Sequence, residues 1–212
     1  MPPKPKDQDY FVSTKVPVNH LDLVAVLTDH SFHMADTNLQ FTKDAEQLIQ
    51  AHPLNVPQTT LRFAKPEDRV DVTNLAATAF SQDRFHKDQY ISNQQADRLK
   101  HAWTDNFFNG KRGNWMVVSL VNDAVAGFLQ LLGGDRSPLT IDLVAVARQF
   151  HGLGLARSMI SFAAENCKHN GKVIVGTQLA NTSSLRLYEG MGFHLTHSDH
   201  VLHAHGPDIL EF

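Results

Sequence analysis

The chain has 212 residues, of which 42% are hydrophobic and 19% are charged, which suits a globular protein of one domain with a small appendage. Its formal net charge of −3 argues against non-specific binding to nucleic acid, because such binding needs a basic surface. The N-terminus lacks an apolar signal segment, no apolar run reaches the ~18 residues of a membrane-spanning helix, and the single cysteine cannot form an internal disulfide, so we expect a cytoplasmic protein without a membrane partner.

The first quarter of the chain predicts a short helix and a strand. Residues 1–9 are rich in proline and lysine and are expected to be disordered. Residues 20–30 (HLDLVAVLTDH) indicate a helix, and residues 31–42 (SFHMADTNLQFT) indicate a strand. Two prolines in residues 51–60 make this stretch the expected linker to a second unit.

The middle of the chain predicts a strand, two helices and a hairpin. Leu61 and Phe63 alternate as in a strand, and Pro66 marks a favourable helix entry. Within the polar stretch 81–113, one apolar helix face is formed by Ala96, Leu99, Trp103 and Phe107. We expect residues 114–133 to form a hairpin that turns at Asn122-Asp123.

The last third alternates strand and helix. Residues 139–146 (LTIDLVAV) indicate a buried strand, and the helix after them is expected to end near Gly171 as its C-terminal cap. Its inner face is formed by Ala156, Met159, Ile160, Ala163 and Cys167. A strand at 172–177, a helix capped by Asn181 or Thr182 and a final strand at 193–205 complete an α+β fold around a mixed sheet.

A glycine pair follows the apolar strand in VAVARQFHGLGLARSMI, residues 144–160. Gly152 and Gly154 stand at the mouth of a predicted helix, where unpaired backbone N–H groups and the helix dipole favour an anion such as a phosphate. A lone G-x-G is also compatible with a simple tight turn. A dinucleotide fingerprint would need a third glycine where Arg157 stands.

Two segments resemble the motifs of the GCN5-related N-acetyltransferases (GNAT family). Residues 141–165 (IDLVAVARQFHGLGLARSMISFAAE) resemble the acetyl-CoA motif, with His151 where the family usually has Arg or Gln. The second motif, N-x-x-[AS]-x-x-x-Y-x-x-x-G-F, is met at Asn181, Ser184, Tyr188, Gly192 and Phe193. This resemblance implies a mixed, mostly antiparallel sheet flanked by helices, with acetyl-CoA as co-substrate and no metal.

The resemblance also implies roles for individual residues. The strand Val144-Ala145-Val146 would splay from its neighbour and align the pantetheine arm, with Asn181 in contact with that arm. Tyr188 would protonate the leaving thiolate, since a phenol of pKa about 10 can serve a thiol of pKa about 8.5. The remaining acetyl-CoA contacts would come from Gln149, Phe150, His151, Gly152, Leu153, Gly154 and Ala156.

A narrower resemblance concerns the acceptor. Residues 84–107 and 177–188 are similar to TDP-fucosamine acetyltransferase and other nucleotide amino-sugar N-acetyltransferases, with departures at Asp83 and in the histidine-rich tail. The similarity implies an acceptor of the dTDP-4-amino-4,6-dideoxyhexose type. Its diphosphate could be offset by charge-assisted hydrogen bonds from Arg84, His86 and Lys87, with a solvated basic turn as the alternative for these residues. The similarity also implies a partial N-terminal GNAT-like subdomain at 10–57 before the main domain at 58–212, and a possible homodimer. The shared Phe-His pairs in residues 30–37 and 191–198 fit such a repeat, with coincidence as the alternative.

Several alternatives stay open from the sequence. The proton of the attacking amine has candidate acceptors in His86, Asp83 and Asp142 or in a chain of water molecules. The acceptor has rivals in a peptide N-terminus or a small free amine, and a non-catalytic acyl-CoA sensor is disfavoured because Tyr188 and the glycine turn are both present.

A metal site is not expected from the histidine-rich tail. In a strand, the side chains of His194 and His200 would point to one face, and those of His197, His203 and His205 would point to the other. No three of these histidines have the spacing of a known helical or Cys/His zinc site. The five are His194, His197, His200, His203 and His205.

Overall fold

The computed structural model describes residues 10–49, 59–80 and 83–206. The expected disorder of residues 1–9 lies outside these residues, as do most of the predicted linker at 51–60 and the predicted domain boundary at 57/58. No helix of the described residues is long and apolar enough to cross a membrane.

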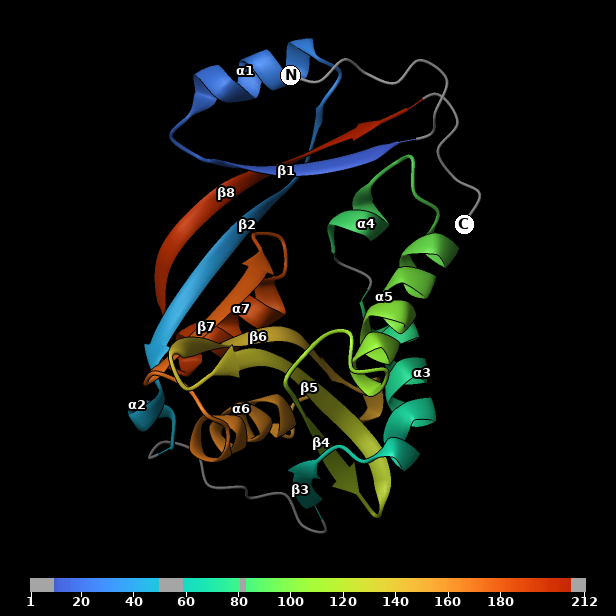
Figure 1. The fold of residues 1–212 in the computed structure, drawn as a ribbon, viewed down its shortest axis with the longest axis vertical. Helices are drawn as coiled ribbons and strands as arrows, with labels where there is room; N and C mark the ends of the chain where they lie inside the picture. Colours follow the sequence, from blue (N-terminus) through green and yellow to red (C-terminus); the bar gives the residue numbers. More distant parts are fainter. Residues whose placement is uncertain (1–9, 50–58, 81–82, 207–212) are drawn as a thin grey trace.

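A single eight-stranded sheet organises the fold, with strand order β1-β8-β2-β7-β6-β5-β4-β3 (Figure 1). Neighbouring strands are antiparallel except for the central pair β6–β7, which is parallel. The predicted mixed, mostly antiparallel sheet is therefore confirmed. The strands are β1 (Phe11–Pro17), β2 (His33–Asp44), β3 (Thr59–Phe63), β4 (Trp115–Val121), β5 (Ala124–Gly134), β6 (Ser137–Val146), β7 (Lys172–Gln178) and β8 (His194–His205).

The helices lie on both faces of this sheet. Alternation along the strands sends side chains to both faces, so that Val117 and Leu129 pack with Met159 of α6, while Met116 and Phe128 pack on the opposite face with α3. Helices α3 and α5 stand side by side there (Figure 1). The helices are α1 (Leu21–Asp29), α2 (Ala45–Ile49), α3 (Arg69–Ala79), α4 (Arg84–Lys87), α5 (Asn93–Phe108), α6 (Leu155–Asn166) and α7 (Thr182–Gly190), with short 3-10 turns η1 (Pro66–Asp68) and η2 (Arg148–Phe150).

The parallel pair at the centre of the sheet separates along its length. Strands β6 and β7 pair only from Leu139 to Ile141 of β6. Beyond Ile141, β6 continues beside β5 as far as Val146, whereas β7 continues beside β2 as far as Gln178. The sheet therefore opens between β6 and β7, and the predicted splay of residues 144–146 is confirmed.

Most predicted elements are present, with some differences. Asn122 and Asp123 both have positive φ, as a tight hairpin turn requires. Gly171 is not the cap of α6, because this helix already ends at Asn166 and Cys167 is extended; the glycine has φ +90° in the turn before β7. Strand β1 and helix α2 were not predicted.

The two Phe-His pairs both stand where a strand begins after a helix. Their strands, β2 and β8, are antiparallel neighbours in the sheet. Cys167 is buried in the core, and burial raises the pKa of its thiol to about 12. This is the behaviour expected of a packed cysteine rather than of a nucleophile.

Candidate active site

A pocket of about 360 Å³ lies at the opening between β6 and β7. Its walls come from both halves of the chain: β1 and β2 from the N-terminal part, the segment of α4 and α5, strands β6 and β7, and helix α7. The pocket at the centre of the sheet is therefore lined by side chains from segments that are far apart in the sequence. Of the sequence candidates, Val144, Asn181, Tyr188, Arg84, Asp83 and Asp142 line it.

The turn at one end of β6 exposes backbone to solvent. Gly152 and Gly154 have φ values of +80° and +79°, a left-handed conformation that glycine adopts without a steric cost. A Cβ atom built on either glycine would meet no atom within 4 Å. Their conformation rather than close packing therefore requires glycine, and the open space beside them is available to a ligand.

Helix α6 begins at this turn without a cap. Its N-cap residue is Gly154, and no side chain of the described residues accepts a hydrogen bond there. The first N–H groups of a helix carry partial positive charge and need acceptors. His151 donates through Nε2 to the carbonyl oxygen of Val146 at 2.8 Å, which fixes the turn against the end of β6.

Tyr188 of α7 lines the pocket. Helix α7 places it there, with Asn181 as N-cap accepting from the backbone N–H of Ser184 at 3.2 Å. The Tyr188 side chain is only 2% exposed and its ring packs against Phe41 and Phe193 at centroid distances of 6.1 and 5.6 Å. Burial raises the pKa of this phenol above its ordinary value, so it stays protonated near neutral pH.

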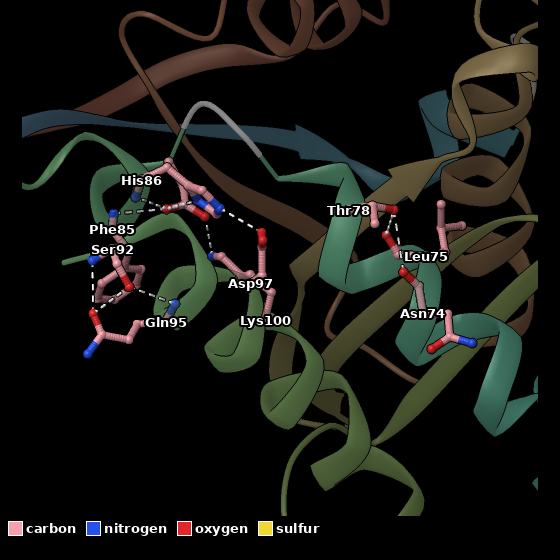
Figure 2. Close-up of polar contacts among 10 residues, drawn as sticks. Asn74, Leu75, Thr78, Phe85, His86, Ser92, Gln95, Asp97 and Lys100 are labelled. Carbon is pink, nitrogen blue, oxygen red and sulfur yellow. Dashed lines mark hydrogen bonds and ion pairs between the residues drawn. The ribbon is translucent and has the colours of Figure 1, made fainter. Parts of the chain in front are cut away.

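A buried charge network holds α4 against α5 (Figure 2). Asp83 caps α4 by accepting from the backbone N–H groups of Phe85 and His86 at 2.8 and 3.2 Å, and the Lys100 ammonium lies 2.9 Å from its other oxygen. Burial alone would raise the pKa of Asp83, but Lys100 and His86 outweigh it and the net pKa is lowered. Asp83 is therefore an ionised anchor with its oxygens already engaged.

His86 belongs to this network rather than to the pocket. Its Nδ1 is 3.1 Å from Asp83 and its Nε2 is 3.0 Å from Asp97 of α5, as Figure 2 shows for the latter contact. Its side chain is 7% exposed. Because both ring nitrogens face carboxylates, His86 can offer neither a donor to a phosphate nor a free base to an amine.

Of the three predicted phosphate contacts, the structure brings only Arg84 to the pocket; Lys87 and His86 are not among its lining residues. The Arg84 guanidinium lies over the Phe85 ring at 4.7 Å and makes no ion pair with another described residue. Its Nε is buried and has no hydrogen-bond partner in the part of the chain that the structure describes. Burial lowers the pKa of Arg84, partly offset by Asp83 and Asp36. Arg84 is thus an unpaired cation at the pocket wall.

Asp142 also lines the pocket but is already paired. Its carboxylate accepts from Arg112 at 2.6 and 2.8 Å and from Gln130 at 2.8 Å. Both oxygens of the Asp142 carboxylate are therefore already engaged by donors of the described residues.

Sequence reasoning missed three pocket residues on or beside α5. The Lys100 ammonium lies 4.8 Å from the Trp103 ring centroid, and the Arg112 guanidinium lies 5.2 Å from the same ring. The available signal was Lys100 itself, since it follows Ala96 by four residues and so falls on the apolar face of the helix. Asn38 and Gln40 of β2 also line the pocket, which no local pattern indicates.

A second cluster of functional side chains lies at β8. His203 and His205 meet His33 of β2 and Asp88, and their ligand atoms all lie within 4.8 Å of one another. Only two of the tail histidines, His203 and His205, belong to this cluster. Spacing within the tail could not indicate the other two members, because His33 and Asp88 come from distant segments.

Comparisons with known proteins agree with this geometry. Residues 70–193 match the Acetyltransferase (GNAT) family. The spore coat polysaccharide biosynthesis protein SpsD of Bacillus subtilis is 33% identical over 141 residues, which is 66% of this chain and 48% of that protein. The chain therefore spans about half the length of this relative.

Solved structures share the fold at low sequence identity. A conserved protein of Staphylococcus epidermidis has a TM-score of 0.69 at 15% identity, over 92% of this chain and 72% of its own. A tandem GNAT protein from the clavulanic acid biosynthesis pathway has a TM-score of 0.64 at 13% identity, over 94% of this chain and 65% of its own.

Proposed function

Because the chain belongs to the GNAT family of acetyltransferases, we propose that it transfers an acetyl group from acetyl-CoA to the amine of a nucleotide-linked amino sugar. The observation that carries the proposal is the pocket at the β6–β7 opening, with an uncapped glycine turn after β6 and a buried tyrosine at its wall. The opening suits an extended thioester arm, and the turn suits its pyrophosphate.

Acetyl-CoA would lie along the end of β6. Residues 144–146 have no β7 partner, so their free backbone edge can align the pantetheine arm. The pyrophosphate would rest on the turn Gln149 to Gly154 and on the first N–H groups of α6, including that of Ala156. Asn181, at the pocket wall, would contact the arm through its side-chain NH₂, since its oxygen already caps α7.

The reaction would proceed by direct attack. The neutral amine nitrogen forms a bond to the thioester carbonyl carbon, whose oxygen becomes an oxyanion that a backbone N–H near Val146 can hold. The C–S bond then breaks and the thiolate takes a proton from Tyr188. The attacking nitrogen loses its extra proton through water, because Asp83, His86 and Asp142 are already engaged, and the Tyr188 phenolate regains a proton from water so that the cycle closes.

The acceptor class rests on two observations. The relative from B. subtilis is named for polysaccharide biosynthesis, and Arg84 presents an unpaired, partly buried guanidinium to the pocket. Charge-assisted hydrogen bonds from such a group suit a diphosphate. We therefore assign to Arg84 the diphosphate of a 4-amino-4,6-dideoxyhexose nucleotide, with His86 and Lys87 in a supporting role at most.

A panel of acceptors tests this function. Acetyl-CoA is supplied with dTDP-linked amino sugars, the same sugars without their nucleotide, a peptide N-terminus and a polyamine, and released thiol is measured. We expect turnover with a nucleotide-linked sugar and poor turnover with the bare sugar. Equal turnover of a peptide or bare amine would refute the substrate class and leave the acetyltransferase activity standing. Absence of turnover with bound acetyl-CoA would favour an acyl-CoA sensor.

A further inference from the structure

The cluster of His33, Asp88, His203 and His205 lies beside the pocket rather than in it, next to the pocket residue Phe85 of α4. None of its four members is among the residues that line the pocket. The side chains of His203 and Asp88 are 0% exposed, and that of His33 is 31% exposed. The cluster is therefore largely closed to solvent and contributes no side chain to the pocket lining.

Strand geometry assembles the histidines. His203 and His205 are two residues apart in β8, so their side chains point to the same face. His33 of β2 is the direct cross-strand partner of His203. Asp88, from the loop after α4, completes the group from above this face. Its position is fixed because its Oδ1 accepts from the backbone N–H of Tyr90 at 2.9 Å.

Three imidazole nitrogens surround one carboxylate oxygen. Asp88 Oδ2 is 2.5 Å from His203 Nδ1, 2.9 Å from His205 Nε2 and 3.6 Å from His33 Nε2. The last nitrogen is buried and has no hydrogen-bond partner among the described residues. A buried nitrogen left unpaired is unfavourable, and hydrogen bonds within the group do not satisfy it.

The rings are held in place by aromatic packing. Phe85 stacks on His203 at a centroid distance of 6.0 Å, and Phe11 meets the same ring edge-on at 4.9 Å. Tyr90 packs on His205 at 4.9 Å and on His33 at 5.3 Å. The imidazoles therefore have little freedom to turn away from one another.

We propose that these four residues bind a divalent transition-metal ion of the zinc class. Three imidazoles and one carboxylate match the ligands and number that Zn²⁺ takes in tetrahedral protein sites. Ligand atoms at about 2.0–2.1 Å from such an ion lie about 3.3 Å apart. The present separations, from 2.5 Å to at most 4.8 Å, bracket that value, so sub-ångström to ångström shifts suffice.

The ion would be structural. All four positions of a tetrahedral site are filled by protein, which leaves none open for a substrate. The ion would fasten the loop after α4 to β2 and β8. That loop follows α4, which carries the pocket residues Arg84 and Phe85, so the same fastening would hold the acceptor wall of the pocket in place.

Metal content and cobalt spectroscopy test the site on the full chain prepared without a histidine tag. After zinc loading and dialysis, we expect one zinc ion per chain. Replacement by Co²⁺ should give the intense visible absorption of a tetrahedral complex. This spectrum of the unaltered protein needs no variant, so it remains decisive if a variant fails to fold.

A matched pair of variants locates the ion. His33→Gln changes a partly exposed ligand, whereas His194→Gln changes an exposed histidine of the same sheet outside the cluster. His33→Gln should weaken metal binding by roughly tenfold or more, since even loss of a supporting contact to a ligand costs 10–100-fold, and His194→Gln should leave it unchanged. Three results would overturn the proposal. The protein could retain no zinc after loading with a micromolar excess, the cobalt spectrum could be that of an octahedral complex, or the two variants could bind zinc with equal affinity.

Discussion

Gly152→Ala is the substitution that most sharply isolates pyrophosphate binding. The glycine has φ +80°, and the added Cβ would point into space that no protein atom occupies within 4 Å. In the free protein the cost is therefore backbone strain alone, about 1–2 kcal/mol for a left-handed non-glycine residue. In the complex the same Cβ stands where we expect the pyrophosphate, so binding carries an additional loss.

Gly110→Ala provides the matched control. Gly110 has φ +67° and equally open surroundings, but it stands in the turn after α5, not in the turn after β6 where we expect the pyrophosphate. Both variants should lose about 1–2 kcal/mol of unfolding free energy, which lowers Tm by several degrees. Only Gly152→Ala should raise the Kd for CoA, by about tenfold or more, equivalent to about 1.4 kcal/mol.

Isothermal titration calorimetry with CoA measures both affinities, and thermal melts confirm that each variant is folded. Equal Kd values for the two folded variants would refute the reasoning, because the turn would then shape the chain without contacting the cofactor. A loss of affinity in both would assign the effect to general strain instead.

Three further predictions concern the pocket and its support. Tyr188→Phe should lower kcat by roughly 10²–10⁴-fold with little change in acetyl-CoA affinity. The control is Tyr90→Phe, at an exposed tyrosine outside the pocket, which should leave kcat unchanged. If Tyr188→Phe retained its kcat, Tyr188 would not be the general acid. Arg84→Ala should raise KM for the nucleotide sugar by roughly 10–100-fold, as expected for a lost charge-assisted hydrogen bond, and leave KM for acetyl-CoA unchanged; Lys87→Ala is the control, and equal effects of the two would contradict the assignment. Asp83→Asn should destabilise the fold by roughly 3–5 kcal/mol at pH 7 because Lys100 loses its buried partner. Since the pKa of Asp83 is lowered on folding, its stabilisation is present above its unfolded pKa and is lost as pH falls through the folded pKa, so urea melts of the two proteins should converge in strong acid; a constant difference would contradict this.

The local features of the site could be predicted from the sequence, because each is encoded within one short segment. The glycine turn and the helix after it follow from two glycines behind an apolar strand, and Asn181 is found as the cap of α7 where its position suggests. The features that depend on distant pairing could not. His86 looked like a basic loop residue, but its burial follows from Asp97 on the next helix.

The order of strands in the sheet is the second feature that could not be predicted from the sequence. Strand β2 lies between β8 and β7. Its pairing with β7 sets Asn38 and Gln40 beside the pocket residues Gln178 and Gly176, and its pairing with β8 sets His33 beside His203. Register between strands more than 150 residues apart is fixed by the packed fold, and no local periodicity reports it. The convergence of the histidine cluster was missed for this reason.

The central claim is that the β6–β7 opening and the turn after it hold acetyl-CoA. Hydrogen–deuterium exchange with and without acetyl-CoA tests this on the intact protein, without knowledge of the acceptor. We expect new protection at residues 144–157 and at 181–188, with none at helix α1. Unchanged exchange at 144–157 under saturating acetyl-CoA, or protection confined to other segments, would contradict the account.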